Sequence, residues 1–407
     1  MAAITTKDLA VNGGTPVRDG SRSWPAWPIW DEREEQALLG VLRSGVWGSH
    51  AGTQVREFEA EFARCHQARH GVCNVNGTAS LEIALRAAGV GMGDEVIVPP
   101  YTFIATASSV LLVNGTPIFA DIDPETYNLD PRAAEAAITP RTKAIIPVHI
   151  GGCPADMDAF TELARKHNLI LIEDCAQAHA AAWNGHKVGS IGDMGTFSFQ
   201  SSKNINAGEG GIIITNDEGY YERCWSVSNV GRVLNGAWYD HRLLGANYRM
   251  TEFQGALLRV QLTRLNDLAA RRSENARFLS SELAKIPGIR PLTVDPRVTQ
   301  HAYHLYIFRF DASHFGKMTR NEFVQALGAE GIPCSVGYGP LYQADLFRVE
   351  HTYASTQFDY KQVRCPVTER ACAEEAVWIF QNMLLGTRED MQDIVDAVAK
   401  IQRAATD

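Results

Sequence analysis

The chain has 407 residues, a length that predicts two domains or one large α/β unit with a smaller appendage. Hydrophobic residues make up 45% of it and charged residues 21%, ordinary proportions for a globular chain that exclude disordered and fibrous proteins. The formal net charge is −9, and basic residues gather only in isolated pairs such as Arg271 and Arg272, so nucleic-acid binding is not expected.

No feature of the sequence predicts secretion, membrane insertion or a metal site. The first residues have no apolar core of signal-peptide length, and no run of eighteen apolar residues occurs, so we expect a cytoplasmic protein. The eight cysteines are dispersed without a C-x-x-C spacing, which is typical of free thiols. His66 and His70 stand four apart, but no acidic residue lies between them as in metalloprotease helices. We therefore expect no bound metal.

Hydrophobic periodicity predicts alternating helices and strands over the first part of the chain. Residues 31–45 are typical of a helix, because acidic residues open the segment and a glycine closes it. Further elements in this part are expected as helices at 55–70, 76–91, 103–115 and 155–168, and as strands at 95–100, 116–123, 144–151, 169–177, 196–200 and 211–217. Strands rich in Val, Ile and Phe that alternate with helices indicate a large three-layer α/β/α domain with a mostly parallel sheet.

A second, smaller unit is expected after that sheet. Residues 251–285 have a long helical period that could bridge two units. The segments beyond them that predict a smaller C-terminal α+β domain are 304–311, 321–331, 332–339 and 388–404. We therefore place the N-terminal segment and large domain at 1–265 and the small domain at 266–407.

Lys203 has the most unusual surroundings of any lysine in the chain. It lies between the apolar segment 196–200 and the glycine-rich NAGEGG, whereas the other lysines mostly lie in polar or helical segments. A lysine held at the end of a buried strand has a lowered pKa and can act as an amine nucleophile that forms a Schiff base. A solvated lysine in a loop is an equally good interpretation of the local sequence.

Asp174 and Gln177 stand at the carboxyl end of the strand expected at 169–177, where open α/β sheets place their ligand crevice. A buried carboxylate there can stabilise a protonated ring nitrogen, as the chemistry of pyridoxal 5'-phosphate (PLP) requires. An aspartate that merely caps the next turn is common and explains the position as well.

Two further segments suit a phosphorylated, planar cofactor. Gly77, Thr78 and Ala79 open an expected helix, where free backbone N–H groups favour a phosphate, although an ordinary turn is the simpler interpretation of these residues alone. Phe103 follows the strand at 95–100 and could place its ring against a planar cofactor, or belong to the core. A lysine, an aspartate, a phosphate-binding helix start and an aromatic ring at the strand ends of one sheet together match what PLP needs.

At this point the sequence resembles the DegT/StrS family of PLP-dependent sugar and cyclitol aminotransferases, which have the aspartate aminotransferase type of fold. The resemblance extends over nearly the whole chain. The segments that carry it are GGTPVR, NGTASLEIALRAAGVGMGDEVIVPPYTF, DIDPETYNLDP, TPRTKAIIPVHIGG, IEDCAQAHAA, TFSFQSSKNINAGEGG, NYRMTEFQGALLRVQL and HAYHLYIFR.

The resemblance implies a role for each cofactor residue. Lys203 is expected to bind PLP as a Schiff base and to move protons, Asp174 to pair with the pyridine nitrogen, and Gln177 to contact the ring hydroxyl. Phe103 is expected to stack on the ring.

The resemblance also implies a phosphate site and a homodimer. Gly77, Thr78 and Ser198 are expected to hold the phosphate. In this family a partner subunit completes each site, and Asn247 in the segment NYRM resembles the residue that crosses to the partner's phosphate. We therefore expect a homodimer with shared active sites.

The implied reaction moves an amino group from glutamate or glutamine to a keto sugar, nucleotide-linked in many members, or to a ketocyclitol. The GGTPVR and VHIGG segments favour the cyclitol branch slightly. Residues 228–247 are expected to form a substrate loop, whose groups suited to a polyol are Trp238, Tyr239, His241 and Arg242, although a plain surface loop is an equal alternative. Tyr338, His301 and His304 could line the same cleft, but a core role is favoured for each.

Other functions stay open as alternatives. Some similar proteins are sugar dehydratases, but these replace the lysine at the position of Lys203 with histidine. A related aminohydroxybenzoate synthase shares several segments and has histidine where this chain has Gln177. A regulatory protein that binds PLP without turnover is a further alternative, which the presence of a Schiff-base lysine disfavours.

Overall fold

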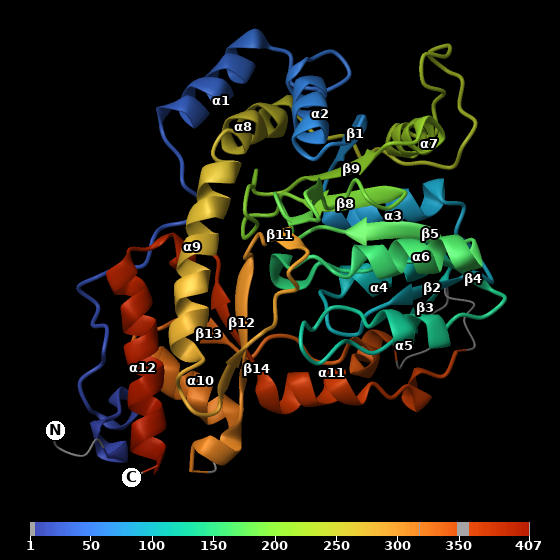
Figure 1. Ribbon diagram of the computed structural model, residues 1–407. Helices are drawn as coiled ribbons and strands as arrows, with labels where there is room; N and C mark the ends of the chain where they lie inside the picture. The colour runs from blue at the N-terminus through green and yellow to red at the C-terminus, as the bar shows by residue number, and fades with distance from the viewer. Residues whose placement is uncertain (1–4, 317, 348–357, 407) are drawn as a thin grey trace.

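The computed structural model describes residues 5–316, 318–347 and 358–406 and shows two unequal units (Figure 1). The larger unit is built around a seven-stranded sheet and the smaller one around a four-stranded antiparallel sheet. The long helix α9 (Leu265–Leu283) runs from one unit to the other. The predicted α/β fold with a smaller C-terminal α+β unit is thereby confirmed.

The other helices within the described residues are α1 (Glu32–Ser44), α2 (Gln54–Cys65), α3 (Gly77–Ala87), α4 (Ala105–Leu112), α5 (Pro131–Ala136), α6 (Met157–His167), α7 (Glu218–Ser228), α8 (Glu252–Leu262), α10 (Arg320–Ala329), α11 (Pro366–Arg370) and α12 (Arg388–Thr406). The strands are β1 (His70–Asn74), β2 (Glu95–Val98), β3 (Thr116–Phe119), β4 (Thr142–Ile145), β5 (Ile170–Asp174), β6 (Ala182–Trp183), β7 (His186–Lys187), β8 (Met194–Ser198), β9 (Gly211–Thr215), β10 (Ile289–Pro291), β11 (Val298–Gln300), β12 (Leu305–Phe310), β13 (Cys334–Ser335) and β14 (Ala376–Phe380).

The large sheet has the strand order β1-β9-β8-β5-β4-β2-β3. Every neighbouring pair from β8 to β3 is parallel, whereas β9 runs antiparallel to both β8 and β1. Because β5 and β8 are parallel neighbours, their carboxyl ends meet at the same edge of the sheet, with Asp174 opposite Thr196. The cofactor crevice expected at that edge therefore has one defined place in the fold.

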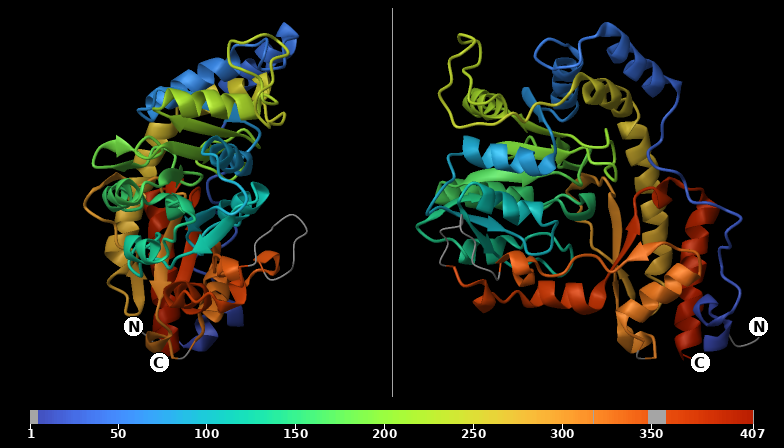
Figure 2. Two further views of the ribbon diagram at one scale, coloured as in Figure 1. Left: turned by 90° about the vertical axis from the view of Figure 1, so that its right-hand side faces the viewer. Right: turned by 180° about the vertical axis from the view of Figure 1, so that it is seen from behind.

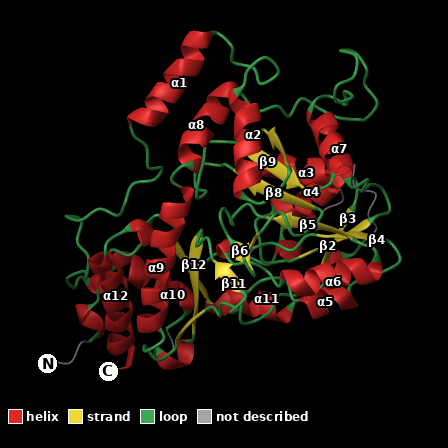
Figure 3. Cartoon of the chain, turned by 45° about the horizontal axis from the view of Figure 1, so that its top comes forward, coloured by secondary structure: helices red, strands yellow, loops and turns green. Residues whose placement is uncertain are grey.

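Alternating residues of each strand pack against different helices. Val96 and Val98 lie in the apolar cluster that contains α3 and α4, whereas Ile97 between them lies in the cluster that contains α5 and α6. Figures 1 and 3 show these helix pairs on opposite sides of the sheet. Strands buried on both faces explain the near-continuous Val and Ile runs of the sequence.

Local signals end the helix expected at 31–45 where the sequence predicts. Helix α1 starts after Asp31, whose side chain accepts a hydrogen bond from the amide of Arg33, and stops at Gly45 in the left-handed conformation (φ 69°).

Several predicted elements were too long. The helices expected at 76–91 and 103–115 end at Ala87 and Leu112, before the left-handed Gly89 and Asn114. The strand expected at 144–151 is β4 (Thr142–Ile145), because Pro147 has no N–H to continue the ladder. The helix expected at 55–70 ends at Cys65, because Gln67 takes a left-handed conformation and starts the turn into β1. The helix expected over 251–285 is divided into α8 and α9.

The small unit has a core of aromatic and aliphatic side chains between its sheet and helices α9, α10 and α12. Phe308 and Phe310 of β12 contact Phe323 of α10. The segment after β13 leaves this core and returns to the large unit, where Tyr342, Phe347 and Tyr360 pack around Phe119. Residues of the C-terminal part thus complete the core of the large unit.

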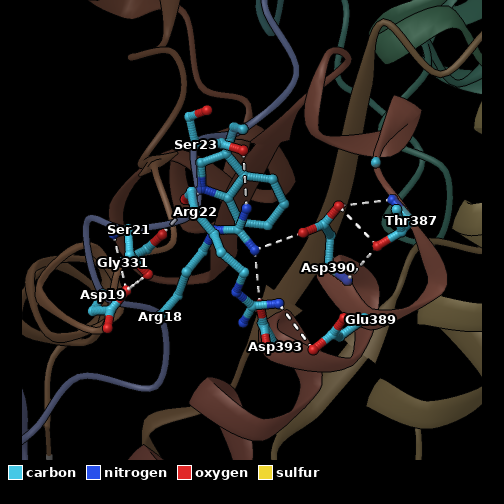
Figure 4. A network of polar contacts seen from close by, with 12 residues as sticks. Arg18, Asp19, Ser21, Arg22, Ser23, Gly331, Thr387, Glu389, Asp390 and Asp393 are labelled. Atoms are coloured by element: carbon cyan, nitrogen blue, oxygen red, sulfur yellow. Dashed lines mark hydrogen bonds and ion pairs between the residues drawn. The ribbon is translucent and has the colours of Figure 1, made fainter.

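The first described residues also lie against the small unit. We call residues 6–25 the N-terminal strap, which lies beside α10 and α12, as the right-hand view of Figure 2 shows. Arg18 of the strap reaches two carboxylates of α12, Asp390 and Asp393, each at 2.7 Å from its Nη1 (Figure 4). The strap therefore ties the start of the chain to its last helix. Among the described residues, no helix combines the length and the apolar character needed to span a membrane.

Candidate active site

A cavity of ≈ 720 Å³ opens at the sheet edge where β5 and β8 end, and the small unit supplies its opposite wall. From the large unit, Asp174 and Ser198 at the two strand ends line it, and the residues around β14 line it from the other side. The sequence-predicted residues that line this cavity are Gly77, Thr78, Phe103, Asp174, Gln177, Ser198, Lys203, His304 and Tyr338.

Lys203 lies in the loop between β8 and β9, and its side chain is enclosed by the cavity wall. Its backbone N–H donates to the carbonyl oxygen of Gln200 at 2.9 Å, which fixes the turn that carries it. Burial lowers the pKa of its ammonium group to about 8, and the nearby charge of Asp174 partly opposes that shift. Lys203 is therefore unprotonated more often near neutral pH than a lysine with the ordinary pKa, and in that form it can act as a nucleophile or base.

Asp174 is the last residue of β5 and is 4% exposed. Burial raises the pKa of its carboxyl group, while hydrogen bonds from the Thr106 hydroxyl at 2.8 Å and the Ala176 amide at 3.1 Å oppose that rise. The two bonds hold the carboxylate in one orientation. A fixed, buried carboxylate suits a protonated ring nitrogen as partner.

Gln177 is held by a hydrogen bond at each end of its amide. Its Oε1 accepts from the Gly151 N–H at 2.7 Å, and its Nε2 donates to the Tyr338 hydroxyl oxygen at 3.1 Å. Gly151 has a left-handed φ of 61°, a conformation that glycine adopts without strain. Burial raises the pKa of Tyr338 to about 12, so this hydroxyl keeps its proton and can donate it in a hydrogen bond to a bound molecule.

The start of α3 forms an open cradle beside Ser198. A Cβ atom on Gly77 would lie 2.7 Å from the Cβ of Ser198, so only glycine fits this approach. No hydrogen-bond partner within the described chain occupies the amides of Gly77 and Thr78. Ala79 differs from the prediction, because its amide already donates to Asn76 Oδ1 at 2.8 Å and the residue does not line the cavity.

Phe103 and His304 both line the cavity. The ring of Phe103 is 56% exposed and available to cover a bound planar group. His304 is buried, and burial holds its pKa well below the usual value, so its imidazole is neutral. Asn204 Nδ2 donates to Ala302 O, which leaves Asn204 Oδ1 to accept from His304 Nδ1 at 3.2 Å. The remaining nitrogen, Nε2, is then an acceptor.

The predicted substrate loop projects away from the cavity of its own chain. Figure 1 shows the segment after α7 extending from the upper edge of the large unit. Trp238 and Tyr239 are each 77% exposed, and Arg242 pairs with Asp240 of the same loop. The residues predicted here that do not line the cavity of their own chain are Trp238, Tyr239, His241, Arg242 and the exposed Asn247. Within one chain, these side chains contribute nothing to the site.

Several cavity residues were absent from the prediction. Thr106 fixes Asp174, and its only sequence signal is its place one helical turn after Thr102, whose hydroxyl it meets at 3.1 Å. Trp27 lines the cavity from the N-terminal part, anchored by its Nε1 to the carbonyl oxygen of Ser201 at 3.1 Å. Gln381 follows β14, and nothing in its local sequence marks it as a cavity residue.

One buried cluster outside the cavity has the composition of a metal site but not its chemistry. His149, Glu173 and Cys175 lie close together. His149 Nδ1 accepts from the Ala155 N–H at 3.0 Å, so its Nε2 must carry the proton and donate to Glu173 at 3.1 Å. Glu173 also accepts from three backbone amides. No lone pair of the imidazole is left for a cation, and the cluster is a hydrogen-bonded anchor of the sheet.

The cavity fits PLP group by group. The open amides at Gly77 and Thr78 with the Ser198 hydroxyl match a phosphate, and the buried carboxylate of Asp174 matches a ring nitrogen. The amine of Lys203, with a pKa of about 8, matches an aldehyde.

Comparison with known proteins agrees with this fit. The model of the DegT/DnrJ/EryC1/StrS aminotransferase family matches residues 28–399. A relative from Streptoalloteichus tenebrarius, 41% identical over 98% of both chains, carries the provisional name L-glutamine:3-amino-2,3-dideoxy-scyllo-inosose aminotransferase. A second protein of that organism, L-glutamine:2-deoxy-scyllo-inosose aminotransferase, is 40% identical over 97% of both chains.

Among solved structures, the crystal structure of 3-amino-5-hydroxybenzoic acid synthase superposes with a TM-score of 0.87 at 35% identity, covering 93% of this chain and 98% of that one. The family matches confirm the predicted cofactor and class of enzyme. This chain belongs to the DegT/DnrJ/EryC1/StrS aminotransferase family and is a PLP-dependent aminotransferase.

Proposed function

We propose that this enzyme transfers the amino group of L-glutamine to a ketocyclitol of the inosose class. The observation that carries the proposal is the cavity that joins a low-pKa lysine, a buried aspartate and an open helix N-terminus, in a chain similar end to end to two relatives named for that reaction. Bound PLP supplies an electron sink that stabilises negative charge on the carbon bearing the amino group.

Each cavity residue has a proposed task in this reaction. Lys203 holds the cofactor through Nζ and, once released, moves a proton to and from the reacting carbon. Asp174 keeps the ring nitrogen protonated, and Thr106 holds Asp174 in place. Gln177 contacts the ring hydroxyl, while Phe103 covers the face of the ring.

The phosphate group of PLP is assigned to the N-terminal end of α3. Gly77 and Thr78 offer backbone N–H groups, and Ser198 offers its hydroxyl. His304 and Tyr338 on the small-unit side offer one acceptor and one donor suited to the hydroxyl groups of a cyclitol.

The charges of the cavity favour a ketocyclitol over a nucleotide-linked sugar. Lys203 is the only lysine or arginine among the described residues that line it, and Asp174 and Glu209 line it as acids. A nucleotide diphosphate carries several negative charges that nothing else in this chain's cavity would offset. An uncharged polyol ring needs only the hydrogen-bonding groups that the cavity has.

The test uses purified enzyme reconstituted with PLP. Addition of L-glutamine is expected to convert the absorption band of lysine-bound PLP into that of pyridoxamine phosphate. Subsequent addition of 2-deoxy-scyllo-inosose should restore the first band and yield an aminocyclitol detectable by mass spectrometry. Failure of the ketocyclitol, with turnover of a nucleotide-linked keto sugar instead, would contradict the acceptor class; an aromatic product would indicate synthase chemistry like that of the structural neighbour.

We also propose a homodimer in which each subunit completes its partner's site. The support is the position of Asn247 and of the loop residues Trp238, Tyr239, His241 and Arg242, which are turned away from the cavity of their own chain. Mixing inactive Lys203→Ala chains with Asn247→Ala chains tests this, because only crossed sites would regenerate one intact site per mixed dimer. No regained activity in confirmed mixed dimers would contradict the shared site. The cytoplasmic location stays a prediction, which cell fractionation tests.

A further inference from the structure

The cavity presents a problem of charge for the amino donor. This inference rests on the proposed function, in which the donor is an amino acid. Its carboxylate has to be held in the cavity while Lys203, the only cation among the described lining residues, engages the cofactor and the proton. A carboxylate left without donors or positive charge in such a site would bind poorly. Among this chain's own lining residues, a neutral hydrogen-bond donor is then the group left to receive it.

Gln381 offers a directed hydrogen-bond donor on this wall. It follows β14, is 4% exposed and lines the cavity. Its Oε1 accepts two hydrogen bonds from Arg272, at 3.0 Å from Nε and 2.5 Å from Nη2. Because a guanidinium only donates, Oε1 must face Arg272 and the NH₂ group must face the other way. Nε2 has no partner within the described chain and is not sealed from the cavity.

Arg272 is an unusual partner for an amide. It is fully buried, and no carboxylate of the described residues lies within ion-pair distance of it. Its Nη1 is buried without any hydrogen bond, and its guanidinium lies 5.2 Å from the ring centre of Trp27, which itself lines the cavity. A buried cation without a counter-charge is costly to folding, and such local conflicts are expected where a residue serves a functional site.

The field of Arg272 reaches the cavity. After burial, Lys203 and His179, its positive charge is the smallest contribution to the lowered pKa of His304, a lining residue. Burial also lowers the pKa of Arg272 itself, to about 9, so it is charged at neutral pH. An anion placed against Gln381 would therefore gain from this charge, and the two bonds to Oε1 strengthen the amide N–H groups as donors.

The chain that follows Gln381 is held by three hydrogen bonds. Asn275, one turn from Arg272 on α9, donates to the carbonyl oxygens of Leu384 at 2.9 Å and Gly386 at 3.0 Å. Asn382 donates to the carbonyl oxygen of Pro25 at 2.9 Å. These contacts fix the amide before any ligand enters, which lowers the cost of binding.

We propose that the Nε2 group of Gln381 binds the α-carboxylate of the amino donor, and that Arg272 is the positioning residue that orients this amide and supplies the positive field behind it. Arg272 does not touch the donor. It acts through Gln381, and the pair forms a carboxylate subsite at the end of β14.

Gln381→Glu in the reconstituted enzyme is the sharpest test. Glutamate keeps an oxygen for Arg272, so folding is preserved, but it replaces the NH₂ donor with a second oxygen and neutralises the cation. We expect the KM for L-glutamine to rise at least about tenfold, the loss typical of a charge-assisted hydrogen bond. The KM for the ketocyclitol should change less than about threefold.

L-Glutaminol, in which a CH₂OH group replaces the carboxylate, separates this role from general damage. In the donor half-reaction, Gln381→Glu should weaken the binding of glutaminol much less than the binding of glutamine. Only glutamine has the α-carboxylate that Gln381 is proposed to bind. Gln200→Glu is the matched control, since Gln200 also lines the cavity, accepts two bonds at Oε1 and donates one from Nε2. That variant should affect the two donors equally.

Arg272→Lys and Gln381→Met provide a second route if Gln381→Glu fails to fold. Both should raise the KM for L-glutamine while PLP affinity, measured by fluorescence titration, stays within about twofold. Equal losses for glutamine and glutaminol, or a selective loss for the ketocyclitol, would overturn the carboxylate subsite. If the unaltered enzyme shows no half-reaction with any amino acid, the proposed function itself fails, which is a different result.

Discussion

Arg18 and Arg272 are both almost fully buried, at 3% and 0% exposure, but they have opposite surroundings. Arg18 meets two carboxylates of α12, donates to the carbonyl oxygens of Arg22 and Ser23 at 3.1 Å, and lies 4.0 Å from the ring centre of Trp24 (Figure 4). Arg272 donates to a single acceptor, the amide oxygen of Gln381, and lies 5.2 Å from the ring centre of Trp27. Its Nη1 has no hydrogen-bond partner among the described residues.

The difference separates an arginine that holds the fold from one placed for a ligand. A buried cation whose donors are all used and whose charge is cancelled has nothing left to offer a bound molecule. One that keeps spare charge beside a cavity adds to binding at the expense of stability, as expected where local rules are broken at functional sites. Substitution of Arg18 should therefore lower mainly stability, and substitution of Arg272 mainly activity.

The largest effect is expected at the cavity. Lys203→Ala should lower the rate of amination at least about 10³-fold, because it removes both the attachment of the cofactor and the proton carrier. The melting temperature should stay the same or rise, since a buried ammonium group is lost. Lys187→Ala is the control, because Lys187 is half-buried outside the cavity and its ammonium group donates to the Ala180 carbonyl oxygen. Turnover by the Lys203 variant would contradict the assignment.

The second prediction compares the two arginines directly in urea unfolding. Arg18→Met should reduce the free energy of unfolding by about 3–5 kcal/mol, because it leaves Asp390 and Asp393 without their buried partner. Arg272→Met should cost less than about 2 kcal/mol, because no carboxylate is left behind and an uncompensated charge is removed. Equal losses in the free energy of unfolding for the two variants would contradict the distinction between the two arginines.

Acid should weaken the Arg18 contact selectively. Burial alone would raise the pKa of Asp390, but hydrogen bonds from Thr387 and Arg18 outweigh it and lower the pKa below its usual value. A carboxyl with a lowered pKa in the folded state stabilises the fold above its unfolded pKa and loses that contribution as pH falls through the folded value. The stability difference between the wild type and Arg18→Met should therefore shrink below about pH 4. Urea unfolding at several pH values measures it.

The smallest predicted effect is a shift in the pH at which the cofactor-free protein captures PLP. The unprotonated fraction of Lys203 grows as pH rises through its pKa of about 8, so the rate of capture should rise with a midpoint there. Asp174→Asn should move the midpoint lower, because the charge of Asp174 raises the pKa of Lys203. Stopped-flow absorbance follows the capture. A midpoint unchanged in that variant would contradict the coupling.

The residues at strand ends were accessible to sequence reasoning. Lys203 and Asp174 stand where apolar strands stop, and parallel strands bring such ends together at one edge whatever the loops do. Ser198 and the start of α3 follow by the same rule. The antiparallel direction of β9 did not follow, because its Val- and Ile-rich sequence reads the same in either direction.

The carboxylate subsite could not be predicted in this way. Arg272 and Gln381 are 109 residues apart, and their contact depends on how the small unit packs against α9. One signal was present in the sequence. Leu265, Ala269, Ala276 and Leu279 form an apolar stripe at helical spacing, and Arg272 falls within it while Arg271 does not. A charged residue among the apolar core positions of a helix conflicts with the hydrophobic pattern, and this conflict singles out Arg272.

The contact between Arg18 and α12 also governs the order in which the chain can assemble as it is synthesised. Arg18 and Asp390 are separated by 372 positions, so the N-terminal strap leaves the ribosome long before its partner exists. The large sheet is complete once β9 has formed, but the strap has no carboxylates to close on until α12 emerges. The strap is therefore made early but docks late, and a nascent-chain folding assay should show it accessible to protease until α12 has emerged.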